Sequence, residues 1–233
     1  MNIMEFFLIF GSRFFENKFN RMSQLVNPKI SSLFSLVILM VISTFGLSML
    51  TYAESVNLKD FALSDLGCTI TPQGKSNAIS CFIFALGMFS TSYILLRIAV
   101  YFRQDNSIIH YRLKNYLCLM GSVGSFIFIF PWNLNNNIHM TGAALMVAAL
   151  WAIGGLLLFE AWKFISFGRF LLLQLILQGT VLTYAVTFAI DSPIRNIPQK
   201  FAVLGLIFVL KIATASPSTL EFSNIFAFNL KKE

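Results

Sequence analysis

Long uncharged apolar runs alternate with short polar connections along this chain. Residues 30–53, 76–96, 115–159 and 170–190 contain no Asp, Glu, Lys or Arg. A helix needs roughly 20 apolar residues to cross a hydrocarbon core about 30 Å thick, and these runs reach that length. The pattern therefore predicts an integral membrane protein. The period-2 alternation expected of barrel strands is absent, which favours an all-α fold.

The apolar runs divide into six predicted spans. The longest run exceeds one helix, and Pro131 together with the following Asn cluster divides it, since Pro and Asn mark turns. The predicted spans are residues 30–52, 77–101, 115–130, 138–164, 167–190 and 198–215. We expect a polytopic six-helix transmembrane bundle, occupying residues 30–215 as one domain.

The segment before the first span has a different pattern. Residues 4–19 carry six Phe interrupted by Glu5, Arg13, Glu16 and Lys18. Charges at the bilayer centre are costly, so this segment is expected to lie along the membrane surface. Residues 1–29 are therefore predicted to be an interfacial amphipathic segment, and residues 216–233 a cytoplasmic tail.

Composition and charge support a membrane domain with a defined orientation. Charged residues make up 12% of the chain, hydrophobic residues 57%, and the mean hydropathy is +0.74. The net charge of +7 is interpreted as an orientation signal rather than a nucleic-acid surface. With six spans, 13 of the 17 Lys and Arg fall on one side and 4 on the other. Both termini are thus predicted to be cytoplasmic, in an inner or plasma membrane.

Candidate chemistry gathers at the outer helix ends. Asp65 and His139 are the candidate catalytic residues, because a carboxylate and an imidazole can act as acid and base. The structural alternatives are that Asp65 closes a turn and that His139 caps a helix or bonds a loop carbonyl. Other polar residues expected on this face are Ser64, Asn77 and Asp191.

Cysteines and metal ligands give two further alternatives. Cys68 and Cys81 both fall on the outer side, where they could form a disulfide or remain buried thiols. The spacing from Cys68 to Cys81 matches no zinc pattern. A metal site built from Asp65, Cys68, His139 and Asp191 is a further alternative, but a sequence cannot supply the ligand geometry, so no metal site is predicted. No motif identifies a cofactor, which stays unknown.

Residues inside the spans are interpreted mainly as packing. Small residues at 121–125 and 142–155 predict a close approach of two helices. Gln174 and Gln178 are expected to face the bundle, and Lys211 to extend its amine to the interface. Glu160 is expected to pair with Lys163.

Three stretches resemble a known family. They are Leu63-Ser64-Asp65-Leu66-Gly67 followed by Asn77 and Phe84-Ala85-Leu86-Gly87, then Ile138-His139-Met140-Thr141-Gly142-Ala143, and finally Gln199-Lys200-Phe201. The pattern resembles the six-helix membrane family catalogued as domain of unknown function 998, which is similar to the DRAM and GPI-remodelling group. The resemblance implies a six-helix bundle with a polar outer-face pocket over residues 30–215. Gln199-Lys200 replaces the charged pair that often opens the last helix of that family.

Three functions fit these features. The first is a non-enzymatic protein that binds membrane lipids or a partner membrane subunit. The second is an enzyme acting on lipid headgroups through Asp65 and His139. The third is a small transporter, which would need polar residues across the midplane, where Gln174 and Gln178 are the main ones. Nucleic acid is not an expected partner.

Overall fold

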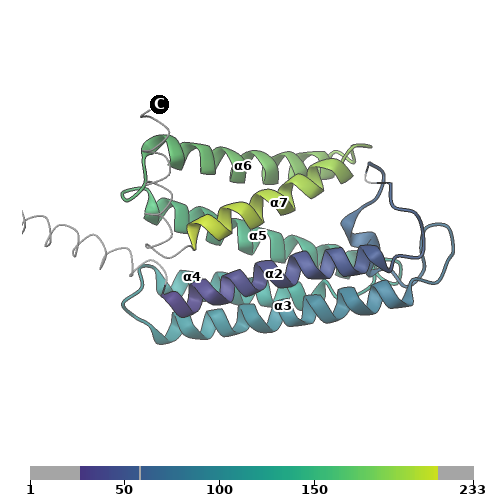
Figure 1. Ribbon diagram of the computed structural model, residues 1–233, viewed down its shortest axis with the longest axis horizontal. Coiled ribbons are helices and arrows are strands. Elements are labelled where there is room, and N and C mark those ends of the chain that lie inside the picture. The colour runs from purple at the N-terminus through teal and green to yellow at the C-terminus, as the bar shows by residue number, and fades with distance from the viewer. Residues whose placement is uncertain (1–26, 58, 215–233) are drawn as a thin grey trace, which may run out of the picture.

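A bundle of long helices makes up the computed structural model, which describes residues 27–57 and 59–214. The elements are α2 (Pro28–Leu50), the 3-10 helix η1 (Leu63–Gly67), α3 (Ala78–Gln104), α4 (Tyr111–Ile127), α5 (Asn136–Ala161), α6 (Phe167–Ala189) and α7 (Asn196–Ala213) (Figure 1). The part of the chain described contains no strand, only an isolated bridge between Ile70 and Ser76. The all-α prediction is confirmed.

Five of the helices are long and apolar enough to cross a membrane: α2, α3, α5, α6 and α7. They indicate an integral membrane protein. The sixth, α4, has 17 residues and carries Arg112 and Lys114 in its first turn. The predicted interfacial segment and the cytoplasmic tail lie outside the described residues, apart from Asn27 to Lys29, which begin α2.

Polar caps fix where the helices begin. Asn27 accepts a bond from the backbone N–H of Lys29 before α2, and Pro28 occupies the first turn, where no partner for its nitrogen is needed. Asn135 caps α5 through the N–H of Ile138, and Ser166 caps α6 through that of Arg169. Pro131 follows the end of α4, so the division of the long apolar run between two helices is confirmed.

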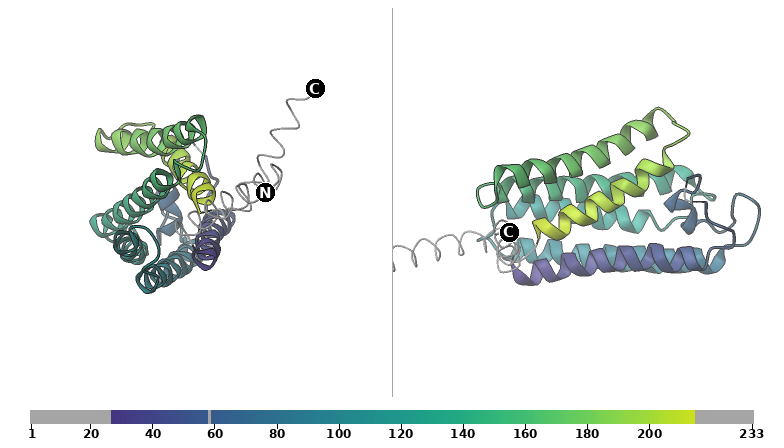
Figure 2. Two further views of the ribbon diagram at one scale, coloured as in Figure 1. Left: turned by 90° about the vertical axis from the view of Figure 1, so that its left-hand side faces the viewer. Right: turned by 45° about the horizontal axis from the view of Figure 1, so that its top comes forward.

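Helices α2 to α5 pack as consecutive antiparallel neighbours, as the end-on view of Figure 2 shows. A Cβ on Gly124 of α4 would lie 2.4 Å from the backbone nitrogen of Met146, and one on Gly142 of α5 would lie 2.4 Å from that of Phe128. Only glycine permits this crossing. The predicted close approach of these helices is confirmed.

Polar side chains inside the bundle form hydrogen bonds that join neighbouring helices. Ser92 of α3 donates to the carbonyl of Ser122 on α4 at 2.8 Å, and Ser122 donates to that of Ser92 at 2.9 Å. The indole of Trp151 on α5 donates to Gln178 on α6 at 2.8 Å, and Gln178 donates to Gln174 at 3.0 Å. The prediction that Gln178 faces the bundle is confirmed by the Trp151 bond.

Helices α6 and α7 pack mainly against each other and close the remaining side of the bundle. Helix α7 lies between α5 and α2, and it contacts α2 only sparsely (Figure 2). Helices α6 and α7 are antiparallel. The hydroxyl of Ser31 on α2 donates to the carbonyl of Thr214, which ends α7. This loose contact between α2 and α7 leaves room for the groove described below.

The two ends of the bundle differ in charge. We call the end where α2 begins and α7 finishes the basic end, and the end that carries η1 the loop end. Eight described cations belong to the basic end: Lys29, Arg97, Arg103, Arg112, Lys114, Lys163, Arg169 and Lys211. Its described carboxylates are Asp105 and Glu160, whereas the loop end has four cations and four carboxylates.

Candidate functional site

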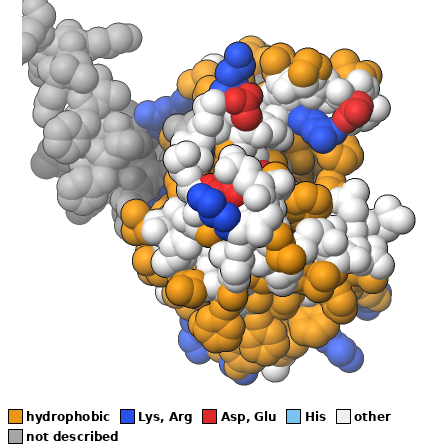
Figure 3. Space-filling view, turned by 90° about the vertical axis from the view of Figure 1, so that its right-hand side faces the viewer, with side chains coloured by type: hydrophobic (Ala, Val, Ile, Leu, Met, Phe, Trp, Pro, Cys, Tyr) orange, Lys and Arg blue, Asp and Glu red, His pale blue; other side chains and the backbone are white. Residues whose placement is uncertain are grey.

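Mixed charges and polar groups cover the loop end, where the sequence places its candidate chemistry (Figure 3). Asp65 lies in η1, and its carboxylate accepts the backbone N–H of Ala62 at 3.0 Å. Burial raises the pKa of Asp65, while Lys200 and Arg195 act in the opposite direction. Asp65 therefore stabilises the turn that forms η1, which is the structural alternative considered for it.

Asn77, just before α3, holds the other side of the same loop. Its amide donates to the carbonyl of Cys68 at 2.9 Å and to that of Leu66 at 3.3 Å, and its side-chain oxygen accepts from Ala53 at 3.4 Å. The hydroxyl of Ser80 also donates to Leu66, at 2.9 Å. Asn77 is buried, so these bonds replace the water that its amide would otherwise bind.

Residues at the start of α7 form hydrogen bonds with the backbone of the same loop. The side-chain oxygen of Gln199 accepts the N–H of Leu63 at 2.8 Å, and Asn196 donates to the carbonyl of Asp60 at 2.6 Å. The amine of Lys200 donates to the carbonyl of Phe61 at 2.6 Å. Gln199 and Lys200 thus fasten the loop to the bundle.

His139 lies in the first turn of α5 and is not hydrogen-bonded to this network. Its Nδ1 is 2.6 Å from the carbonyl oxygen of Phe130, which can only accept, so Nδ1 carries the proton. The ring packs against Phe128 at 4.4 Å and Phe84 at 6.5 Å between centroids. His139 is fully buried, and its Nε2 has no hydrogen-bond partner among the described residues.

No hydrogen bond or ion pair between Asp65 and His139 occurs in the described part of the chain. Phe84 packs against both Gly67 of η1 and the His139 ring. The acid and base roles stay predictions, and the contacts of each residue are those of a structural group.

The remaining loop-end candidates are placed as follows. Ser64 is half-buried within η1, and Asp191 forms an exposed ion pair with Arg195 one turn later. Cys68 and Cys81 are free thiols in the structure. Burial raises the pKa of Cys68 to about 11, and the thiol of Cys81 donates to the carbonyl of Gly67 at 3.3 Å. Their pairing stays a prediction.

Metal-ligating side chains do not gather at this end. Within residues 27–57 and 59–214, no three His, Cys, Asp or Glu side chains are arranged so that they could hold a metal ion. Asp65, Cys68, His139 and Asp191 thus do not form a ligand set in the described part of the chain.

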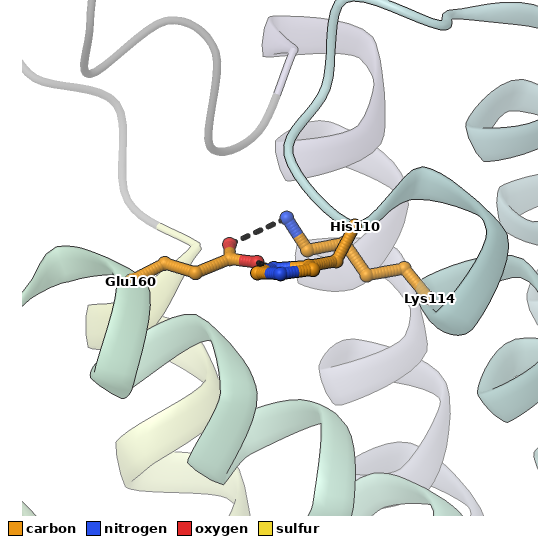
Figure 4. A network of polar contacts seen from close by, with 3 residues as sticks. All are labelled: His110, Lys114 and Glu160. Carbon is orange, nitrogen blue, oxygen red and sulfur yellow. Dashed lines mark hydrogen bonds and ion pairs between the residues drawn. The ribbon is translucent and has the colours of Figure 1, made fainter.

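A buried ion pair at the basic end was missed by sequence reasoning. Glu160 of α5 pairs with Lys114 of α4 at 2.6 Å instead of with Lys163, and its other oxygen lies 2.8 Å from Nδ1 of His110 (Figure 4). Lys114 is fully buried and its amine lies 5.7 Å from the Phe102 ring centroid. A single cation at position 114 gave no signal that it would face inward.

An apolar groove between α2 and α7 was also missed. It is an open groove with a volume of about 570 Å³, within the range of small-molecule sites. Its lining residues are Ser35, Ile38, Leu39 and Ile42 from α2, and Leu204, Ile207, Phe208 and Lys211 from α7. The spacings 35, 39, 42 and 204, 208, 211 each mark one helix face, but the sequence does not say which faces meet.

No family model, no curated protein and no solved structure matches this chain. The resemblance to the six-helix family of unknown function stays a prediction, as do the roles that it implies.

Proposed function

We propose that this chain is a polytopic membrane protein that binds lipid, and that it acts without catalytic chemistry of its own. The observation that carries the proposal is the groove between α2 and α7. It is bounded by two membrane-crossing helices, and its walls are aliphatic and aromatic side chains. Leu39, Ile42 and Leu204 are more than half exposed there, so the groove offers apolar surface to a lipid chain.

The enzymatic alternative has less support. It requires Asp65 and His139 to share a substrate. Instead, the Asp65 carboxylate accepts the N–H of Ala62 in its own turn, and the His139 ring bonds the carbonyl of Phe130 in the connection before α5. The transporter alternative requires a polar path, whereas Gln178 accepts from Trp151 and donates to Gln174. Lipid binding uses the surface that these contacts leave open.

We further propose six spans with both termini in the cytoplasm, in an inner or plasma membrane. Support for the sixth span comes from α4, which connects the basic end, where α3 finishes, with the loop end, where α5 begins. Its 17 residues span about 26 Å at 1.5 Å per residue. Support for the orientation comes from the excess of cations at the basic end.

Lipid binding is tested by filling the groove. Purified wild-type protein should retain phospholipid in native mass spectrometry, and Leu39→Trp should retain several-fold less because the indole occupies the groove. Leu175→Trp on α6 is the matched control, since Leu175 is similarly exposed but lies outside the groove. Equal lipid retention by Leu39→Trp and Leu175→Trp would refute the proposal.

A further inference from the structure

The groove has one cationic mouth. Lys211 lines it within the last turn of α7, at the basic end of the bundle. From there the apolar lining runs along α2 from Ser35 to Ile42, a length of about 10 Å at 1.5 Å per residue. The groove thus has an apolar body that extends toward the bundle middle and a charged mouth near the membrane surface.

The amine of Lys211 is free to bind an anion. Its Nζ donates one bond to the hydroxyl of Ser35 at 3.0 Å, which leaves two of the three ammonium protons for other acceptors. Ser35 is neutral, and no carboxylate in the described part of the chain forms an ion pair with Lys211. The Ser35 bond also holds the amine over the groove, since both residues line it.

Both described carboxylates at the basic end have partners other than Lys211. Glu160 is engaged by Lys114 and His110, and Asp105 accepts bonds from Ser107 and Asn27. Neither of these carboxylates is paired with Lys211. Anionic phospholipids are membrane components that combine an anionic group with apolar chains.

We infer that the groove between α2 and α7 binds one acyl chain of an anionic phospholipid, whose phosphate lies against Lys211. The inference rests on the proposed lipid binding and adds the headgroup charge and the leaflet. Leu39, Leu204 and Phe208 contact the chain, and the ammonium of Lys211 donates to phosphate oxygens. With the basic end in the cytoplasm, the lipid comes from the cytoplasmic leaflet.

The test uses the full chain in bilayers with equal amounts of phosphatidylglycerol and phosphatidylcholine. Both lipids carry the same photoreactive acyl chain and different isotopes, and the cross-linked peptides are mapped by mass spectrometry. We expect the peptides that contain Leu39 and Phe208 to be labelled mainly by phosphatidylglycerol. Lys211→Gln should lower that preference about fivefold, the contribution of one interfacial lysine to anionic-lipid binding.

Two variants make the result specific. Lys163→Gln removes an exposed cation from the same end outside the groove, and it should leave the preference unchanged. Lys211→Arg keeps the positive charge and should keep the preference. A Lys163→Gln effect as large as that of Lys211→Gln would mean general surface attraction and would overturn the inference.

The outcomes separate this inference from the proposed function. Groove peptides labelled equally by both lipids, in wild type and in Lys211→Gln, would overturn the anionic headgroup while keeping lipid binding. Groove peptides labelled no more than α6 peptides, or labelled undiminished in Leu39→Trp, would overturn both. A photoreactive amino acid placed at position 39 tests the other occupants, and its cross-linking to a second copy or to residues 215–233 in place of lipid would also overturn both.

Discussion

Nζ of Lys114 lies 2.6 Å from Oε2 of Glu160, and almost none of either side chain is exposed to solvent. The pair joins α4 to α5 at the basic end, where Phe102 of α3 packs beneath the amine. Two charges out of water are stabilised only while each has its counter-charge.

Removing one charge of this pair should therefore destabilise the bundle. We expect Glu160→Gln to lower the free energy of unfolding by about 3–5 kcal/mol, the usual cost of breaking a buried pair. Thermal unfolding in detergent measures it. Asp191→Asn breaks an exposed ion pair instead and is the control, with an expected loss below about 1 kcal/mol. Similar losses in both variants would contradict a buried pair.

The crossing of α4 and α5 should not tolerate a methyl group. Gly124→Ala would place Cβ 2.4 Å from a backbone nitrogen, so we expect a loss of about 1–3 kcal/mol through forced separation of the helices. Gly179→Ala on α6 meets nothing within 4 Å and should be neutral or slightly stabilising. Detergent unfolding of both variants checks the prediction, and equal stability of the two would refute the tight crossing.

Stability at the loop end should depend on pH through Asp65. Because burial raises its pKa in the folded state, folding favours the protonated form. The stability that protonated Asp65 contributes to the folded state is fully present below about pH 4, the pKa of an unfolded Asp. It is lost as pH rises through the pKa of Asp65 in the folded state. Asp65→Asn keeps an oxygen for the N–H of Ala62 and carries no charge, so its stability should fall less with rising pH.

Melting temperatures measured from pH 4 to about pH 8 test this prediction. The reference is again Asp191→Asn, whose carboxylate is mostly exposed. Its pH profile should follow that of the wild type. Parallel profiles for wild type and Asp65→Asn would show that Asp65 does not lose this contribution.

Orientation is predicted from the cation excess at the basic end. In a background without the three native cysteines, Ser107→Cys in the connection between α3 and α4 should react with an impermeant thiol reagent only after the cells are opened. Lys59→Cys at the loop end should react in intact cells. The reverse pattern would place the termini outside.

The sequence identified candidate residues at the loop end, but it did not identify their hydrogen-bond partners. Asp65 and Asn77 stood out because polar groups beside apolar runs are conspicuous. Their partners, Ala62, Cys68 and Leu66, are backbone groups that every sequence contains, so no pattern could show that Asp65 and Asn77 hold a loop together. His139 likewise looked poised for chemistry until its carbonyl partner and its aromatic neighbours were placed.

The sequence by itself indicated the membrane environment, the positions of the helices along the chain and the uneven distribution of charge between the two ends. Apolar runs of membrane length, divided by Pro131, are local properties, because each helix satisfies its own backbone in lipid. The tertiary structure alone decided which helix faces meet. That choice paired Glu160 with Lys114 rather than with Lys163, and it left Lys211 at the mouth of a groove. Side chains far apart in the chain acquire common surroundings only through packing, and helical periodicity does not encode the rotation of one helix against another.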